Sequence, residues 1–229
     1  GSYASSTTYV TGMAVEKACA QLKERFCAIA AEILGCAADE LAFEDGRVVR
    51  ESTGEAVSLP AIAEKSQCNS CQLAEATAMH SSPVSPPPFM VGMAEIELDR
   101  ETGMVEVLNF DAVVDCGIPI NPALARIQVE GGIVQGIGHT LMEDVTRTPK
   151  GAIRESSLFT YRLPTRLDVG DIRVEFEHSY EPTGPFGAKS IGEIVINTPA
   201  PAIAHAIYRA TGVWHRELPI LPEHVLLAK

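Results

Sequence analysis

Glu193 is the residue of this chain whose sequence context best suits it to act as a base. It follows the segment Gly184–Gly192, which contains three glycines, the basic residue Lys189 and the hydroxyl of Ser190. Glycines let the main chain approach a ligand closely, and a carboxylate held among them can have its proton affinity tuned for proton transfer. Alternatively, Glu193 is an acid near the start of the helix expected over 198–211, where a carboxylate favours the positive end of the helix dipole.

Hydroxyl groups near the N-terminus form a second candidate ligand-binding group. The hydroxyl-rich segment at residues 1–12 includes Ser5, Thr7 and Thr8. Their side chains could donate hydrogen bonds to a phosphate or to a polar heterocycle. An ordinary frayed chain end would have the same composition, so both interpretations stay open.

Lys189 and Gln128 are two further candidates. Lys189 lies four residues before Glu193 and could hold its carboxylate ionised or bind an anionic group, although a solvated loop lysine is the alternative. Gln128 lies in a helical segment interrupted by four glycines, which allow close approach of another backbone or a ligand. Its amide could present a donor and an acceptor to a heterocycle, or it could be an ordinary helix-surface residue.

No protein metal site is predicted. Cys68 and Cys71 have metal-ligand spacing, but one such pair supplies two of the four ligands that a structural zinc needs, and His80 is too isolated to complete the set. The chain also lacks a phosphate-binding glycine motif of the Walker type and the nucleophile elbow of serine hydrolases.

The composition limits the class of protein. The 229 residues are 46% hydrophobic and 21% charged, as in an ordinary globular protein, and the net charge is −12. This charge disfavours nucleic acid as a partner, and no apolar run is long enough to span a membrane. The six cysteines, without a visible signal peptide, are expected to be reduced thiols in a cytoplasmic protein.

The N-terminal third of the chain carries clear local signals. Apolar residues at helical spacing predict a helix over 13–35, with Gly35 as its stop. Asp45-Gly46 predicts a hairpin turn. Residues 58–66 predict a short helix that is capped by Ser58. Residues 67–88 are polar and proline-rich and predict a loop.

The rest of the chain mixes strands and helices without regular alternation. Two strands are expected on either side of a turn at 99–103, followed by a helix capped by Asn121. Further strands are expected over 158–164 and 172–178, and a last short helix at Pro222. The fold class is therefore predicted to be α+β, with mixed sheets and packed helices, in a single domain over 1–229.

Taken together, these segments resemble the C-terminal part of the molybdopterin-binding catalytic subunit of the xanthine dehydrogenase/aldehyde oxidase family of molybdenum hydroxylases. The resemblance covers nearly the whole chain, in the family's order and spacing. It is carried by SSTTYVTGMAV (5–15), AEIELDRETGMVEVL (94–108), VVDCGIPINPALARIQVEGGIVQGIG (113–138), TYRLPT (160–165), and GPFGAKSIGE (184–193) with the helix and tail that follow.

The resemblance implies a role for each candidate residue. Glu193 looks like the family's catalytic base in a hydroxylation that uses water-derived oxygen. The cofactor is expected to be molybdopterin with molybdenum, as such or as the cytosine dinucleotide. The metal is held by the pterin, so no protein ligand to it is expected. The residues expected to contact the cofactor are Ser5, Thr7, Thr8, Gln128, Gly187, Ala188, Lys189 and Ser190.

The resemblance also implies partners, because the family's catalytic subunit is several times longer than this chain. FAD and iron–sulfur clusters are expected on partner domains or subunits, and the N-terminal half of the molybdenum subunit is expected to complete the pocket. The chain is expected to be either a fragment or one subunit of a split enzyme, and to bind no molybdopterin alone. The substrate class is a purine, another N-heterocycle or an aldehyde.

Two alternative functions stay open on the sequence alone. The first is a non-catalytic structural or assembly subunit that keeps the fold and binds no cofactor. The second is a small acidic hydrolase that uses Glu193 with another carboxylate, although no second carboxylate is placed by the sequence to pair with it.

Overall fold

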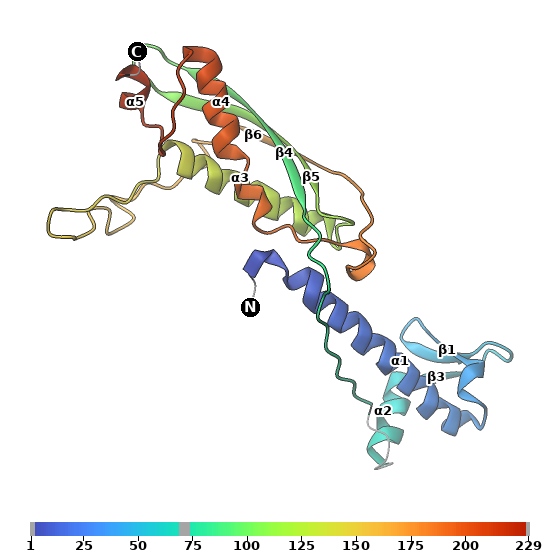
Figure 1. The fold of residues 1–229 in the computed structure, drawn as a ribbon. Helices are drawn as coiled ribbons and strands as arrows, with labels where there is room; N and C mark the ends of the chain where they lie inside the picture. The colour runs from blue at the N-terminus through green and yellow to red at the C-terminus, as the bar shows by residue number, and fades with distance from the viewer. Residues whose placement is uncertain (1–2, 69–73, 228–229) are drawn as a thin grey trace. The chain divides into compact units, whose positions relative to one another are not determined.

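The computed structural model describes residues 3–68 and 74–227 and divides into two compact units. The larger unit contains Gly1–Tyr9 and Val84–Lys229, and the smaller contains Val10–Pro83. Each unit has one three-stranded sheet with helices packed against it (Figure 1). The predicted α+β class is confirmed. None of the helices in the described residues is long and apolar enough to cross a membrane.

The sheet of the larger unit has the strand order β4-β5-β6. Strands β4 (Phe89–Leu98) and β5 (Val105–Asp115) form the antiparallel hairpin expected around the turn at 99–103. Strand β6 (Asp171–Phe176) then pairs parallel with β5 and confirms the strand expected near 172–178. Because β5 and β6 are parallel and Val114 lies opposite Phe176, the C-terminal end of β5 lies beside the segment that leaves β6.

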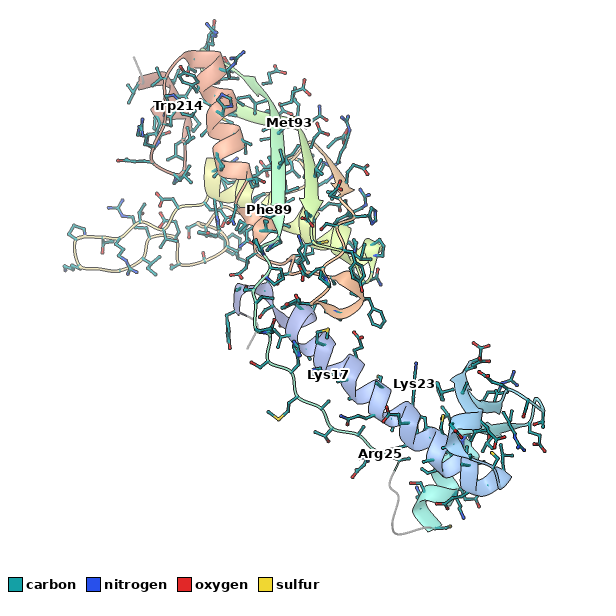
Figure 2. The ribbon with its side chains drawn as sticks, turned by 45° about the vertical axis from the view of Figure 1, so that its right-hand side comes forward. Lys17, Lys23, Arg25, Phe89, Met93 and Trp214 are labelled. Carbon is teal, nitrogen blue, oxygen red and sulfur yellow. The ribbon has the colours of Figure 1, made fainter. Side chains whose placement is uncertain are left out.

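Helices α3 (Pro122–Leu141) and α4 (Pro199–Thr211) pack against this sheet (Figure 1). The core between them is built from apolar side chains of both helices and of β5, including Ile133, Ile203 and Phe110. The opposite side of β4 carries the exposed side chains of Phe89 and Met93, which Figure 2 labels. The helices therefore cover one face of the sheet.

The start of α3 forms as its sequence predicts. The Asn121 side chain accepts a hydrogen bond from the Leu124 backbone N–H at 3.1 Å, and Pro122 occupies the first helical turn. Helix α4 matches the expected helix over 198–211, and the last helix, α5 (Pro222–Leu227), begins at the proline that predicted it.

The strand expected over 158–164 is wrong. This segment consists of turns within the long connection between α3 and β6 that extends away from the sheet (Figure 1). The Ser157 carbonyl accepts hydrogen bonds from the backbone N–H groups of Thr160 and Tyr161, at 3.0 and 2.8 Å. Leu158 and Phe159 are exposed, so apolar alternation here does not mark a buried strand face. Local turn hydrogen bonds satisfy the backbone instead.

The smaller unit follows its local sequence signals closely. Helix α1 (Gly12–Leu34) ends at Gly35, whose φ of 65° is the left-handed conformation that glycine favours. Strands β1 (Leu41–Glu44) and β2 (Arg47–Arg50) form the predicted hairpin, and β3 (Ala56–Ser58) adds a third strand. Helix α2 (Leu59–Cys68) follows Ser58, whose hydroxyl accepts a hydrogen bond from the Ala61 backbone N–H.

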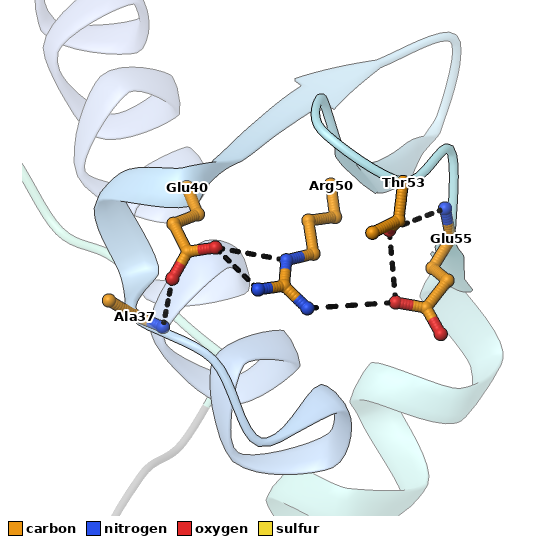
Figure 3. A network of polar contacts seen from close by, with 5 residues as sticks. All are labelled: Ala37, Glu40, Arg50, Thr53 and Glu55. Atoms are coloured by element: carbon orange, nitrogen blue, oxygen red, sulfur yellow. Dashed lines mark hydrogen bonds and ion pairs between the residues drawn. The ribbon is translucent and has the colours of Figure 1, made fainter.

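A network of hydrogen bonds and ion pairs connects neighbouring surface segments of this smaller unit (Figure 3). The Arg50 guanidinium binds Glu40 Oε2 through Nη2 at 2.6 Å and through Nε at 3.0 Å, and its Nη1 lies 3.8 Å from Glu55 Oε2. Glu40 also accepts a hydrogen bond from the Ala37 backbone N–H. The hydrogen bonds from Arg50 and Ala37 lower the pKa of Glu40. The network ties the turn before β1 to the end of β2.

Candidate functional site

The base candidate lies between two short 3₁₀ turns. The first turn is Pro185–Gly187 and the second is Ile194–Ile196, with Glu193 directly before the second. Helix α4 begins only at Pro199, and the Glu193 side chain makes no capping hydrogen bond. The alternative that Glu193 serves as a helix-start acid therefore has no support in the geometry.

Glu193 lines an open cavity of about 600 Å³ in the larger unit. Seven of the nine site residues predicted from the sequence line it: Ser5, Thr7, Thr8, Gln128, Ala188, Lys189 and Glu193. The remaining wall comes from the connection between β5 and α3, from the first turn of α3 and from the loop before Glu193: Cys116, Ile118, Pro119, Ile120, Asn121, Leu124, Ala125, Ile191 and Gly192. Residues 188 positions apart thus meet in one hollow.

The Glu193 carboxylate is held by the N-terminal segment. Ser5 Oγ donates a hydrogen bond to Glu193 Oε2 at 3.1 Å. Ser5 has a φ of 53°, a left-handed conformation that costs a non-glycine residue free energy and therefore points to a constraint from its surroundings. The Glu193 side chain is exposed in this chain. A desolvated carboxylate would require further groups to cover it.

Gly192 lets two segments close around the base. A Cβ built on Gly192 would lie 2.7 Å from Ser5 Oγ and 3.0 Å from Ser5 Cβ. On the other side, Gln128 Nε2 donates a hydrogen bond to the Gly192 carbonyl at 3.2 Å. The residue before Glu193 is therefore fixed from both α3 and the N-terminal segment, and its lack of a side chain makes room for Ser5.

Lys189 has a partner that the sequence did not predict. Its Nζ lies 2.7 Å from Asp115 Oδ2, and the two side chains are only 11% and 19% exposed. Asp115 Oδ1 also accepts hydrogen bonds from Ser179 Oγ at 2.5 Å and from the Gly117 backbone N–H at 3.1 Å. Burial alone would raise the pKa of Asp115, but these hydrogen bonds and the Lys189 charge outweigh it, so the pKa is lowered.

Cys116 is the buried thiol of the cavity wall. It is 3% exposed, and burial, with the neighbouring Asp115 charge, raises its pKa to about 11. At neutral pH it is a neutral thiol, so it contributes an apolar wall to the cavity rather than a nucleophile.

The remaining two predicted site residues lie beside the main cavity. The Gly187 carbonyl accepts hydrogen bonds from the backbone N–H groups of Ile118 at 2.9 Å and Glu181 at 3.1 Å. Ser190 lines a smaller hollow of about 230 Å³ together with Ser5 and Glu193. Both residues belong to the loop that positions the base, and neither is among the side chains that line the larger space.

Asp115 and the segment that follows it are the site features that sequence reasoning missed. The sequence could have indicated this segment by its place in the chain, because it joins the end of the central strand to the capped start of α3. Of the two cysteines with metal-ligand spacing, Cys68 is exposed at the end of α2, and Cys71 lies outside the described residues. The described residues bring together no group of three or more His, Cys, Asp or Glu side chains able to hold a metal ion.

The sequence and the fold match one family of cofactor-binding proteins. The family model of the molybdopterin cofactor-binding domain matches residues 1–170, and the chain belongs to that family. The resemblance to the xanthine dehydrogenase/aldehyde oxidase family that the sequence indicated is confirmed.

Individual relatives agree with this assignment. The chain is 36% identical over 230 residues to the probable hypoxanthine oxidase XdhD of Escherichia coli (strain K12), covering 100% of this chain and 24% of the relative. It is 32% identical over 235 residues to the 6-hydroxypseudooxynicotine dehydrogenase complex subunit gamma of Paenarthrobacter nicotinovorans, covering 98% and 30%. The chain thus spans about a quarter to a third of the length of these relatives.

A solved structure shows the same fold. The quinoline 2-oxidoreductase of Pseudomonas putida 86 superposes with a TM-score of 0.86 at 28% sequence identity, covering 99% of this chain and 30% of that chain. Both compact units are therefore represented within one chain of a known protein.

Proposed function

We propose that this chain forms part of the molybdopterin site of a molybdenum hydroxylase and supplies its catalytic base, Glu193. The main support for the proposal is the common cavity, in which Glu193 lies beside six residues that the family resemblance assigns to the cofactor. Under this proposal residues 1–229 act as one C-terminal molybdopterin-binding domain, although they form two compact units.

The lining of the cavity suits such a cofactor. Molybdopterin presents a polar heterocyclic edge and a phosphate, and the cavity offers hydroxyl donors, a side-chain amide and an ammonium group. Thr7, Thr8 and Gln128 would hold its polar edges, and Lys189 and Ala188 would lie along it. Gly192 supports the same assignment, because a side chain there would collide with Ser5 and narrow the space around the base.

The chemistry divides between the cofactor and this chain. Bound molybdenum supplies a Lewis acid that activates water-derived oxygen and accepts two electrons from the substrate. Glu193 would accept, at a carboxylate oxygen, the proton that leaves the water-derived oxygen, and the Ser5 hydroxyl, which donates a hydrogen bond to Oε2, would orient that carboxylate. Because Glu193 is exposed in this chain, the cofactor and further polypeptide must exclude water around it.

Further polypeptide is part of the proposal. The relatives are three to four times longer than this chain, and one is named as a subunit of a complex. We infer that the N-terminal half of a molybdenum subunit completes the pocket and that electrons leave for iron–sulfur clusters and FAD on partner domains or subunits. The substrate class is a purine, another N-heterocycle such as quinoline, or an aldehyde.

Isotopic labelling of the complete enzyme tests the proposed reaction. Hypoxanthine and quinoline are each incubated anaerobically with the enzyme and an artificial electron acceptor in water enriched in ¹⁸O. The hydroxylated product is expected to carry one ¹⁸O atom, measured by mass spectrometry, because the oxygen comes from water. A parallel reaction in ordinary water under ¹⁸O₂ serves as the control and should give unlabelled product.

An aldehyde is assayed only for turnover, since its carbonyl oxygen exchanges with water. Labelling from O₂, or the absence of turnover with all three substrate classes in enzyme that contains molybdenum, contradicts the proposed function.

A further inference from the structure

The Asp115 carboxylate joins three segments that meet beside the cavity. Its own strand, β5, ends at this residue, and its Oδ1 receives the Gly117 backbone N–H of the following turn. The same oxygen accepts a hydrogen bond from Ser179 Oγ in the segment after β6. The other oxygen, Oδ2, forms an ion pair with the Lys189 ammonium in the loop that carries Glu193. One largely buried side chain thus connects the sheet with the base-bearing loop.

The main chain reinforces this connection over two residues on each side. The Lys189 backbone N–H donates to the Cys116 carbonyl at 2.7 Å, and the Ile118 backbone N–H donates to the Gly187 carbonyl at 2.9 Å. A Cβ on Gly117 would lie 2.3 Å from the Gly187 carbonyl oxygen, so the two segments approach as closely as the backbone allows. The ion pair therefore sits at the end of a short backbone pairing.

The loop is fixed at its other end by different contacts. Gly192 is held between the Ser5 side chain and Gln128 Nε2, and Glu193 receives the Ser5 hydroxyl. The loop from Gly187 to Glu193 thus has an anchor at Lys189 and an anchor at Gly192. Removing one anchor leaves Glu193 tethered from one side only.

We propose that Asp115 is a positioning residue for the base: its pairing with Lys189 and Ser179 fixes the loop Gly187–Glu193 on the end of β5, so that the Glu193 carboxylate faces the cavity. This inference deepens the proposed function and rests on it for its kinetic consequence. The structural consequence, an ordered loop, does not depend on the proposed function.

The energetics of the pair support a strong effect. Removing one partner of a largely buried ion pair leaves the other charge unpaired. The resulting loss of folding free energy is larger than the contribution of an exposed ion pair. In Asp115→Asn the Lys189 ammonium, at 11% exposure, would lose its carboxylate and move toward solvent. That movement would pull the loop away from Cys116 and displace Glu193.

Asp111 provides a matched control. It lies four residues earlier on the same strand and also forms an ion pair, with Arg173 Nη1 3.5 Å from Asp111 Oδ1. Those side chains are 66% and 40% exposed, and within the described part of the chain Asp111 forms no hydrogen bond or ion pair with the loop. Asp111→Asn removes an ion pair of the same strand without touching the proposed anchor.

The test compares Asp115→Asn and Asp111→Asn in the assembled enzyme with molybdenum bound. Amide hydrogen exchange of the peptide spanning Ala188–Glu193 is expected to be about tenfold faster or more in Asp115→Asn and unchanged in Asp111→Asn. The kcat of Asp115→Asn is expected to fall by about 10- to 100-fold, with KM within about threefold and molybdenum content near wild type, because a small displacement of a catalytic group costs this much.

Several outcomes would overturn the proposal. Loop exchange and kcat in Asp115→Asn equal to those of Asp111→Asn would do so. Loss of molybdenum, with the remaining loaded enzyme turning over normally, would also do so, because the residue would then serve cofactor retention. If Asp115→Asn does not assemble, Ser179→Ala, which removes the Ser179 hydrogen bond to Asp115 Oδ1 and leaves no buried charge unpaired, undergoes the same exchange and kinetic test.

The two proposals fail separately. If Glu193 is not the base, the kinetic effect of Asp115→Asn disappears while faster loop exchange remains. If Asp115 does not anchor the loop, exchange stays slow whether or not Glu193 is catalytic.

Discussion

Replacing Glu193 with glutamine is expected to lower kcat/KM of the assembled enzyme by about a thousandfold, within the range that a positioned general base contributes. Glutamine has nearly the same size, and its amide oxygen can still accept the Ser5 hydroxyl that binds Glu193 Oε2 at 3.1 Å. It cannot accept a proton at neutral pH. Molybdenum content should therefore stay near wild type while turnover is lost, as measured by metal analysis and steady-state kinetics on one preparation.

Glu101→Gln is the matched control for this prediction. Glu101 is an exposed carboxylate in the turn between β4 and β5 and does not line the cavity. The substitution removes one negative charge, as Glu193→Gln does, and should leave kcat/KM unchanged. Activity of Glu193→Gln within about tenfold of wild type would show that another group acts as the base.

The second large effect is expected at Gly132, on the buried side of α3. A Cβ there would lie 2.1 Å from Val195 Cγ2, and Val195 is only 1% exposed. Gly132→Ala is therefore expected to lower the free energy of unfolding by about 1–3 kcal/mol, the usual cost of overpacking a core. Because Val195 lies two residues after Glu193, activity should fall as well.

Gly131, its neighbour on the exposed side of the same helix, is the internal control. A Cβ on Gly131 would have no heavy atom within 4 Å. Gly131→Ala should therefore raise the free energy of unfolding by up to about 1 kcal/mol, because alanine favours the helical backbone over glycine. Urea unfolding of the two variants measures the difference. Equal stabilisation by both substitutions would mean that α3 does not pack closely against the segment after Glu193.

Local signals predicted much of the fold. Gly35 ends α1, Asp45-Gly46 turns the first hairpin, and Asn121 caps α3, each where the sequence indicated. These features depend on backbone preferences and hydrogen bonds within a few residues, which a single sequence contains. Segment 158–164 shows the limit, because its apolar alternation competes with turn-forming Ser157 and Thr160, and only the three-dimensional surroundings decide between them.

The candidate site was predictable only where residue type and family resemblance pointed to a residue. Glu193, Ser5 and Gln128 could be selected by residue type and by family resemblance, and the structure places all three at one cavity. The role of Asp115 could not be predicted, because Lys189 and Ser179, its two side-chain partners, lie 74 and 64 residues away in sequence. The sequence alone also does not indicate how exposed Glu193 is in this chain, because burial depends on which distant segments surround the side chain.

The proposed function places molybdopterin in this cavity, and the molybdenum content of an enzyme with a blocked cavity measures whether the cofactor binds there. Ala125 lines the cavity from α3, whereas Ala123 is exposed on the same helix and does not line it. Tryptophan at either position has the same helix propensity, but only Ala125→Trp places an indole in the cavity. The assembled variants are compared by metal analysis at matched protein concentration.

Ala125→Trp is expected to lower molybdenum per enzyme molecule by about tenfold, which requires a loss of at least about 1.4 kcal/mol in binding, while Ala123→Trp keeps the wild-type content. Full molybdenum content in correctly assembled Ala125→Trp would contradict the assignment of this cavity to the cofactor.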